Sequence, residues 1–150
     1  FIIQGDFGDQ YNDVVNLIWS KNIKIQEKNK DVDIFFNSIS ILILPSFFEG
    51  CPNVLFEALL RRKLCIVSKG ANSDDFITNG VNGFVYDGSD ENLKKIMIHI
   101  LKILTKEEER FIKENGYNYA KNNFSMNLMV NKYEELFKEI FQRNKICNLL

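Results

Sequence analysis

The sequence runs ISILILP over residues 39–45, SFFEGCP over residues 46–52 and NVLFEALLRR over residues 53–62. The first segment is apolar and rich in β-branched residues without alternation, which is typical of a strand covered on both faces, as in a parallel sheet. Pro45 ends this strand, and the third segment has the apolar spacing of a helix, for which Asn53 is the expected N-cap. A buried strand, a glycine-containing loop and a helix in this order predict one βα unit of an α/β fold.

Strands and helices continue to alternate on both sides of this unit. Further strands are expected at Phe1–Ile3, Asn22–Ile25, Leu64–Val67 and Phe84–Tyr86, with helices at residues 9–20, Asp31–Asn37, Asn53–Arg62 and Ser73–Asn79. Short, continuously apolar strands that alternate with helices are typical of a parallel sheet. The sequence therefore predicts a three-layer, Rossmann-like α/β domain, whose parallel sheet contains Phe1–Ile3, Ile39–Leu44 and Leu64–Val67.

The segment from Asp90 onward is expected to be helical. One helix is predicted over Asp90–Leu104. Thr105 and Glu108 have the spacing of a capping box, which opens a second helix that ends near Asn123. A third helix is predicted over Ser125–Arg143, with an apolar stripe at Met129, Tyr133, Leu136, Phe137, Ile140 and Phe141. The predicted domain thus has a helical C-terminus.

Length and charge restrict the class of protein. The 150 residues suffice for one domain, and 19 basic against 20 acidic side chains give a net charge of −1, so no basic excess indicates nucleic acid as a partner. Cys51, Cys65 and Cys147 show no zinc or disulfide spacing, which favours a reducing, cytoplasmic setting. No apolar run reaches the roughly 20 residues that span a bilayer. The chain begins at Phe1 inside a strand-like run, so we expect it to be part of a longer protein.

The loop at residues 45–52 is the expected site of chemistry. Gly50 leaves room for close approach of a ligand to the backbone, and the free N–H groups at the start of the following helix favour an anion. Glu57 interrupts an otherwise apolar helix. Its carboxylate must have a partner or face a cleft, because burying it unpaired is costly. Glu49 lies in the loop, where it can reach a ligand that Glu57 also contacts.

The pattern Pro-Ser-x-x-Glu-Gly-x-Pro-Asn-x-x-x-Glu-Ala over residues 45–58 resembles the group 1 family of retaining glycosyltransferases with the GT-B fold. The core of that family's motif is two glutamates separated by seven residues, which Glu49 and Glu57 match. Residues 75–85 are similar to the family's Glu-x-Ile-x-x-Gly-x-x-Gly-x-x-Val. The chain departs from the family at residues 62–64, where Arg-Lys-Leu stands in place of Gly-x-Pro.

The resemblance implies that residues 1–150 are the nucleotide-sugar-binding, C-terminal half of a GT-B enzyme, without that half's first strand and without the N-terminal acceptor domain. In the family the first glutamate contacts hydroxyls of the transferred sugar, which gives Glu49 the catalytic position. The second contacts the ribose, which gives Glu57 a donor-binding role. Further donor contacts are implied for Gly50, Cys51, Pro52, Asn53, Gly5 and Gly8. Neither a metal ion nor a cofactor other than the donor is expected.

The implied function is retaining hexosyl transfer from a nucleotide sugar, with a UDP-hexose as the expected donor, in the synthesis of a polysaccharide, a lipooligosaccharide or a related glycan. The acceptor glycan or lipid would bind through the missing N-terminal domain, so this chain alone is expected to be inactive. The parent is expected in the cytoplasm, with peripheral association at the inner face of the membrane. Two alternatives stay open: a non-catalytic nucleotide-sugar-binding or interaction module, and a nucleotide-sugar epimerase with the GT-B fold.

Several of these residues also have purely structural interpretations. Gly5 and Gly8 can be turn residues, Asn53 can serve only as an N-cap, and Cys51 can be a small loop residue, since no histidine lies near it in the sequence. The pairs Phe35-Phe36 and Phe47-Phe48 are expected in the core rather than as a stacking platform for a ligand.

Overall fold

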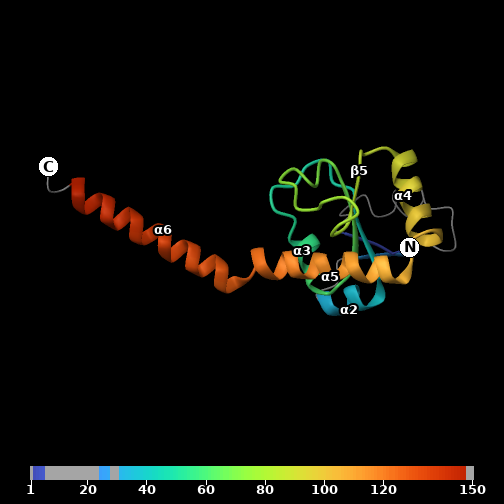
Figure 1. The fold of residues 1–150 in the computed structure, drawn as a ribbon, viewed down its shortest axis with the longest axis horizontal. Helices are drawn as coiled ribbons and strands as arrows, with labels where there is room; N and C mark the ends of the chain where they lie inside the picture. The colour runs from blue at the N-terminus through green and yellow to red at the C-terminus, as the bar shows by residue number, and fades with distance from the viewer. Residues whose placement is uncertain (1, 6–23, 28–30, 148–150) are drawn as a thin grey trace. The chain divides into compact units, whose positions relative to one another are not determined.

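The computed structural model describes residues 2–5, 24–27 and 31–147 (Figure 1). The chain divides into two compact units, Phe1–Ile41 and Leu42–Leu150. The helix predicted at residues 9–20 lies outside the described residues.

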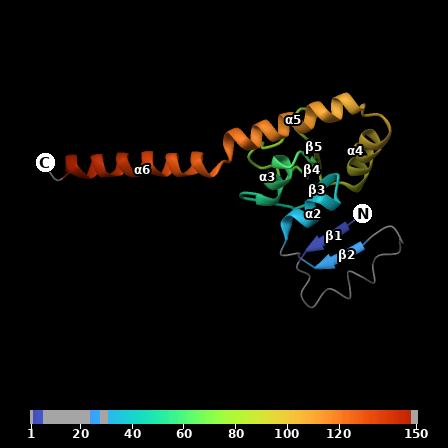
Figure 2. The same cartoon turned by 90° about the horizontal axis from the view of Figure 1, so that it is seen from below.

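The described residues of the first unit form two strands and one helix. Strand β1 (Ile2–Gly5) pairs in parallel with β2 (Lys24–Glu27), with Ile3 opposite Ile25, and Figure 2 shows the two arrows pointing in the same direction. The predicted strand at Asn22–Ile25 thus overlaps β2, which continues to Glu27. Helix α2 (Val32–Ser38) begins where the Asp31 carboxylate accepts hydrogen bonds from the N–H groups of Asp33 and Ile34.

The second unit is built on a three-stranded sheet in the order β3 (Ile41–Leu44), β4 (Leu64–Ser68) and β5 (Phe84–Tyr86). Every residue of the central strand β4 is buried, and β4 pairs in parallel with β5, with Ile66 opposite Phe84. Helix α3 (Asn53–Leu60) connects β3 to β4, as a crossover between neighbouring parallel strands requires. The predicted α/β class, with parallel strands, helices between them and a helical C-terminus, is confirmed.

The structure describes two sheets, one of β1 and β2 and one of β3, β4 and β5, and that Phe1–Ile3 shares a sheet with the later strands stays a prediction. One prediction about the fold is wrong: the segment expected as a helix at Ser73–Asn79 is not helical. A turn ends at Asp74, residues 75–78 are irregular, and Asn79 forms an isolated bridge with Gly83. Side chains bind two of its N–H groups: Ile77 N donates to Asn72 Oδ1 and Thr78 N donates to Asn82 Oδ1, each at 2.7 Å. Both asparagines are buried, so these bonds replace the backbone bonds of a helix.

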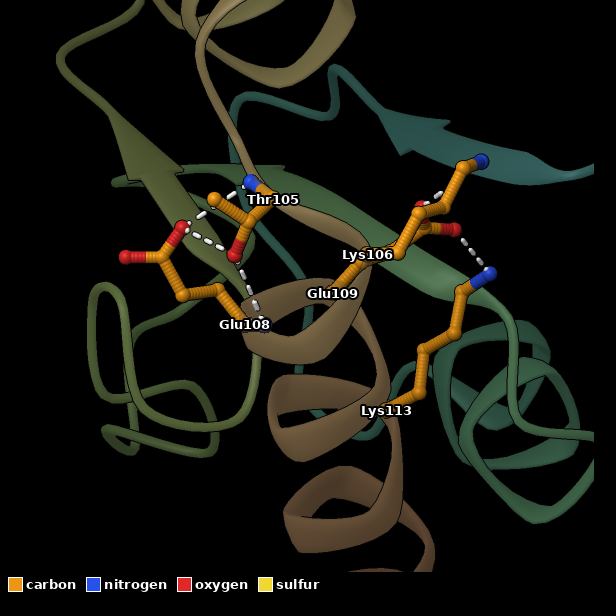
Figure 3. Close-up of polar contacts among 5 residues, drawn as sticks. All are labelled: Thr105, Lys106, Glu108, Glu109 and Lys113. Atoms are coloured by element: carbon orange, nitrogen blue, oxygen red, sulfur yellow. Dashed lines mark hydrogen bonds and ion pairs between the residues drawn. The ribbon is translucent and has the colours of Figure 1, made fainter.

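Three helices follow the sheet: α4 (Asp90–Lys102), α5 (Lys106–Asn123) and α6 (Met126–Cys147). Figure 3 shows the first turn of α5, where Thr105 N donates to Glu108 Oε2 at 2.9 Å and Glu108 N donates to Thr105 Oγ1 at 3.2 Å. The predicted capping box is therefore confirmed. Thr105 N, together with Thr105 Oγ1 at 2.7 Å, donates to Glu108 Oε2, and these two bonds lower the pKa of the Glu108 carboxyl. On the next turn, Glu109 pairs with Lys113.

Helix α5 packs against α3 through a small residue. A Cβ atom at Gly116 would lie 2.7 Å from Leu59 Cδ2 and 3.1 Å from the Asn82 carbonyl oxygen, so only glycine fits there without a shift. Phe124, at the end of α5, stacks on Phe56 of α3 with their ring centroids 3.7 Å apart. These contacts fix the helix that follows the Glu49 loop to the rest of the second unit.

Helix α6 differs from the other helices of this unit in that its apolar stripe is exposed. Exposed side chains are those of Met126, Met129, Val130, Tyr133, Leu136, Phe137, Ile140 and Phe141. Within residues 31–147 and the two short strands before them, no helix combines the length and the apolar character needed to cross a bilayer.

Candidate functional site

Glu49, in the loop between β3 and α3, is held by two hydrogen bonds, one from within the loop and one from the segment after β4. Ser46 Oγ donates to Glu49 Oε1 at 2.7 Å, which turns the carboxylate back over the loop. Ser73 Oγ donates to the Glu49 carbonyl oxygen at 3.0 Å, which fastens the backbone on the other side. Glu49 is half-buried, and its second carboxylate oxygen can accept hydrogen bonds from a ligand hydroxyl.

The turn that follows β4 also contacts this loop. Ser68 Oγ donates to the Ser46 carbonyl oxygen and accepts from Ala71 N at 3.0 Å. A Cβ atom at Gly70 would lie 1.9 Å from the Phe47 carbonyl oxygen, so the two backbones touch. Sequence reasoning did not assign Ser68 or Gly70 to the site. Ser68 could have been found from its position at the carboxyl end of the neighbouring strand, because parallel sheets bind ligands at that edge.

The start of α3 is arranged differently from the prediction that Asn53 caps it. Pro52 is the N-cap residue, with no side-chain capping bond, and Asn53 is the first helical residue. The Asn53 side chain instead accepts from the Cys51 thiol, with Sγ and Oδ1 3.9 Å apart. Gly50 has open space where a Cβ would be. No side chain therefore caps α3, although Asn53 N donates to the Cys51 carbonyl oxygen at 3.0 Å, and the positive end of the helix dipole suits an anion.

Glu57 lies one turn into α3, between residues that are deeply buried. Leu55, Phe56, Ala58 and Leu59 are at most 6% exposed, whereas Glu57 itself is half-buried. Its carbonyl oxygen accepts from Arg61 Nη1 at 3.1 Å. Within the described residues its carboxylate has no protein partner, and that it faces a cleft stays a prediction. That Glu49 and Glu57 contact one ligand stays a prediction.

The predicted core position of Phe47 and Phe48 is wrong. Phe47 is fully exposed and Phe48 is 76% exposed, although Phe36 of the other pair is buried as expected. Pro45 ends β3, and the loop is then held both by the bond from Ser46 to Glu49 within it and by the bond from Ser73, after β4, to the Glu49 carbonyl oxygen, with the two rings outside it.

Gly5 is the last residue of β1, and Gly8 lies outside the described residues, so the donor contacts of both glycines stay predictions. Cys51 is exposed in the Glu49 loop. A pocket of about 400 Å³ lies beside α4 and α5 and contains none of the predicted site residues. Its lining includes His99, whose ring packs edge-on to Phe84 at 5.9 Å, as expected for a packing residue.

The departure at Arg62 leaves the turn after α3 intact. Lys63 N donates to the Ala58 carbonyl oxygen at 3.0 Å and Arg62 N donates to that of Leu59 at 2.9 Å, which is the Schellman pattern. Arg62 occupies the left-handed position of this turn with φ at 52°, where glycine is the usual residue. Two contacts with α5 hold it there: its guanidinium pairs with Glu114 at 2.8 Å and lies 3.7 Å from the centre of the Tyr117 ring.

Solved structures with a similar fold include a glycosyltransferase and a protein that binds UDP and glucose. A glycosyltransferase from Rickettsia africae is 26% identical with a TM-score of 0.81, over 93% of this chain and 39% of that one. Anabaena HepE, solved in complex with UDP and glucose, is 20% identical with a TM-score of 0.79, over 92% of this chain and 40% of HepE.

The sequence matches the family model of the group 1 glycosyl transferases over residues 11–119. The chain therefore belongs to the group 1 glycosyltransferase family. CapM, a capsular polysaccharide biosynthesis glycosyltransferase of Staphylococcus aureus, is 24% identical over 135 residues. That alignment covers 89% of this chain but 35% of CapM, so the chain spans about a third of the length of such a relative.

Proposed function

We propose that this chain is the donor-binding domain of a retaining glycosyltransferase that transfers a hexose from a UDP-hexose. The observation that carries the proposal is the Glu49 loop: Ser46 holds the carboxylate at 2.7 Å, and the loop leads into a helix start that no side chain caps. A fixed carboxylate suits sugar hydroxyls, and uncapped amides at a helix start suit a diphosphate.

Within this proposal the two glutamates have separate tasks. Glu49 orients the hexose through its hydroxyls, while Glu57 of α3 binds the ribose. The amides of Gly50 and Cys51 and the positive end of the α3 dipole stabilise the charge that develops on the leaving UDP. The bond from the anomeric carbon to the diphosphate oxygen breaks, a glycosidic bond of the same configuration forms to the acceptor hydroxyl oxygen, and the proton of that hydroxyl leaves with the UDP. Neither a metal ion nor another cofactor is included.

The biological setting is also part of the proposal. Membership in the family and the similarity to CapM support a role in surface-glycan synthesis. We place the enzyme in the cytoplasm, peripherally at the inner face of the membrane. There the acceptor glycan or lipid would meet a further domain of a longer protein, without which this chain is expected to be inactive. Because the turn at Arg62 keeps the geometry of the usual glycine turn, this departure gives no support to a non-catalytic module.

Calorimetry with UDP and with UDP-glucose tests the division of roles. We expect Glu57→Gln to weaken the binding of both ligands, because the ribose is common to both. The expected loss of binding free energy is about 1.5–3 kcal/mol, or roughly tenfold to a hundredfold in affinity. Glu49→Gln keeps an oxygen that can accept from Ser46, so we expect it to spare UDP and to weaken only UDP-glucose.

Glu135→Gln on the exposed surface of α6 is the matched control, and it should change neither affinity. Equal losses for both ligands in both site variants would mean that the roles are misassigned. Unchanged affinities in both would mean that the two glutamates are ordinary surface residues.

A further inference from the structure

We propose that Ser46 is a positioning residue for the bound sugar, because it fixes the Glu49 carboxylate, and that Ser68 supports Ser46 from the neighbouring strand. This inference rests on the proposed function, in which Glu49 binds the hexose hydroxyls. Ser46 Oγ donates to Glu49 Oε1 at 2.7 Å, and Ser68 Oγ donates to the Ser46 carbonyl oxygen. Both serines therefore act on the sugar through Glu49.

The Ser46 hydroxyl differs from most serine hydroxyls in loops in its choice of partner. Such hydroxyls commonly bond to nearby backbone groups, whereas Ser46 donates to a carboxylate three residues further along the chain. A hydroxyl has one proton, so this bond uses the only donor of the side chain. Hydrogen bonds to a charged acceptor are short and strong. The bond thus selects one orientation of the Glu49 side chain and leaves Oε2 for the ligand.

Ser68 holds Ser46 through a bond of defined direction. Ser68 is 4% exposed and is the last residue of β4. Its oxygen accepts from Ala71 N at 3.0 Å, while its single proton is donated to the Ser46 carbonyl oxygen. Because both partners are backbone atoms, the bond connects the end of the buried strand to the start of the Glu49 loop. The residue that fixes Glu49 is therefore itself fixed to the sheet.

The Glu49 side chain is ordered before a ligand arrives. Ser73 Oγ holds its carbonyl oxygen at 3.0 Å and Ser46 holds its carboxylate, so both ends of the residue are restrained. A flexible side chain that becomes ordered only on binding lowers the affinity by about two- to tenfold. Ser46 removes this cost for a ligand that contacts Glu49. UDP carries no hexose, so its affinity should not depend on Ser46.

Calorimetry of the 150-residue chain with UDP and with UDP-glucose tests this role. We expect Ser46→Ala to weaken UDP-glucose by about two- to tenfold and to leave UDP unchanged. Ser46→Thr keeps the hydroxyl and should bind UDP-glucose more tightly than Ser46→Ala. Ser68→Ala should also weaken UDP-glucose selectively. The control Ser38→Ala removes a hydroxyl that donates to the Phe35 carbonyl oxygen at 2.6 Å, and it should change neither affinity.

A double-mutant cycle with Glu49→Ala separates positioning from a general effect on the loop. If Ser46 acts through Glu49, Ser46→Ala should cause no further loss of UDP-glucose affinity in a chain that already carries Glu49→Ala. Additive losses overturn the positioning role of Ser46, as do equal losses of UDP and UDP-glucose in Ser46→Ala. Loss of both ligands in Ser68→Ala overturns the support assigned to Ser68.

The outcomes also separate this inference from the proposed function. If Glu49→Ala weakens UDP-glucose but Ser46→Ala does not, only the positioning role is refuted. If the original chain binds no UDP, or if Glu49→Ala leaves the UDP-glucose affinity unchanged, the proposed function is refuted, and this inference fails with it.

Discussion

Helices α5 and α6 follow each other in the chain, and both have an apolar stripe at helical spacing, but they differ in what the stripe contacts. In α5 the residues Ile112, Gly116 and Ala120 are buried, and Gly116 lets the helix approach Leu59 of α3 closely. In α6 the stripe from Met126 to Phe141 is exposed. The more apolar of the two stripes is thus the exposed one. Periodicity predicts that a segment is a helix, whereas its burial depends on a complementary surface elsewhere in the chain.

The largest expected effect on stability comes from comparing a leucine-to-alanine substitution at the buried α3–α5 contact with the same substitution on the exposed stripe of α6. Leu59 is 1% exposed at the contact with α5, and Leu136 on α6 is 48% exposed. We expect Leu59→Ala to lower the free energy of unfolding by about 2–5 kcal/mol, because it leaves a cavity in a packed region. For Leu136→Ala we expect a change of about 0.5 kcal/mol or less. Urea unfolding of the two variants measures both values, and equal losses would mean that α6 is buried in solution.

The fold was predictable from the sequence where local patterns decide the structure. The continuously apolar strand over residues 64–67, the capping box of Thr105 and Glu108 and the apolar spacing of α6 all depend on nearby residues, and each was predicted correctly. The irregular segment at residues 73–79 was wrongly predicted as a helix, because the buried side chains of Asn72 and Asn82 bind the N–H groups of Ile77 and Thr78, which a local pattern does not reveal.

The candidate site was likewise predictable only in part from the sequence. Its position after β3 and the spacing of Glu49 and Glu57 are properties of the sequence. The exposure of Phe47 and the support from Gly70 depend on the turn after β4, which is distant in the sequence. Hydrophobicity alone predicted a core position for Phe47, whereas its side chain is fully exposed.

A second, smaller contrast between the helices concerns how their carboxyl groups make stability depend on pH. Three carboxyl groups on α5 have a lowered pKa: Glu108 through its bonds with Thr105, Glu109 through Lys113, and Glu114 through Arg62. A carboxyl whose pKa is lower in the folded state stabilises the fold above its unfolded value, here 4.5, and this contribution is lost as the pH falls through the folded pKa. We therefore expect the free energy of unfolding to decrease as the pH falls below about 4.5.

Urea unfolding at several pH values between about 3 and 7 measures this dependence, and the variant Glu114→Gln identifies its source. The variant should be less stable than the original chain near neutral pH, and the difference should shrink in acid, where Glu114 is protonated. Glu134→Gln on α6 is the control, because it makes the same change of charge at an exposed residue, whose Oε2 atom lies 3.8 Å from Lys138 Nζ. A stability difference for Glu114→Gln that does not change with pH would contradict the assignment.

The smallest expected effect concerns Arg62, which links the turn after α3 to α5. Its positive φ of 52° costs conformational energy in any residue except glycine, and its bidentate pairing with Glu114 and its stacking on Tyr117 offset that cost. Arg62→Ala keeps the strained backbone and loses both contacts, whereas Arg62→Gly loses the contacts but also removes the strain. We therefore expect the melting temperature of Arg62→Gly to lie between those of Arg62→Ala and the original chain. Thermal unfolding of the three proteins measures this order, with Lys132→Ala on α6 as a control for loss of an exposed cation. If the glycine variant melts at or below the alanine variant, strain at Arg62 contributes nothing to the stability of this turn.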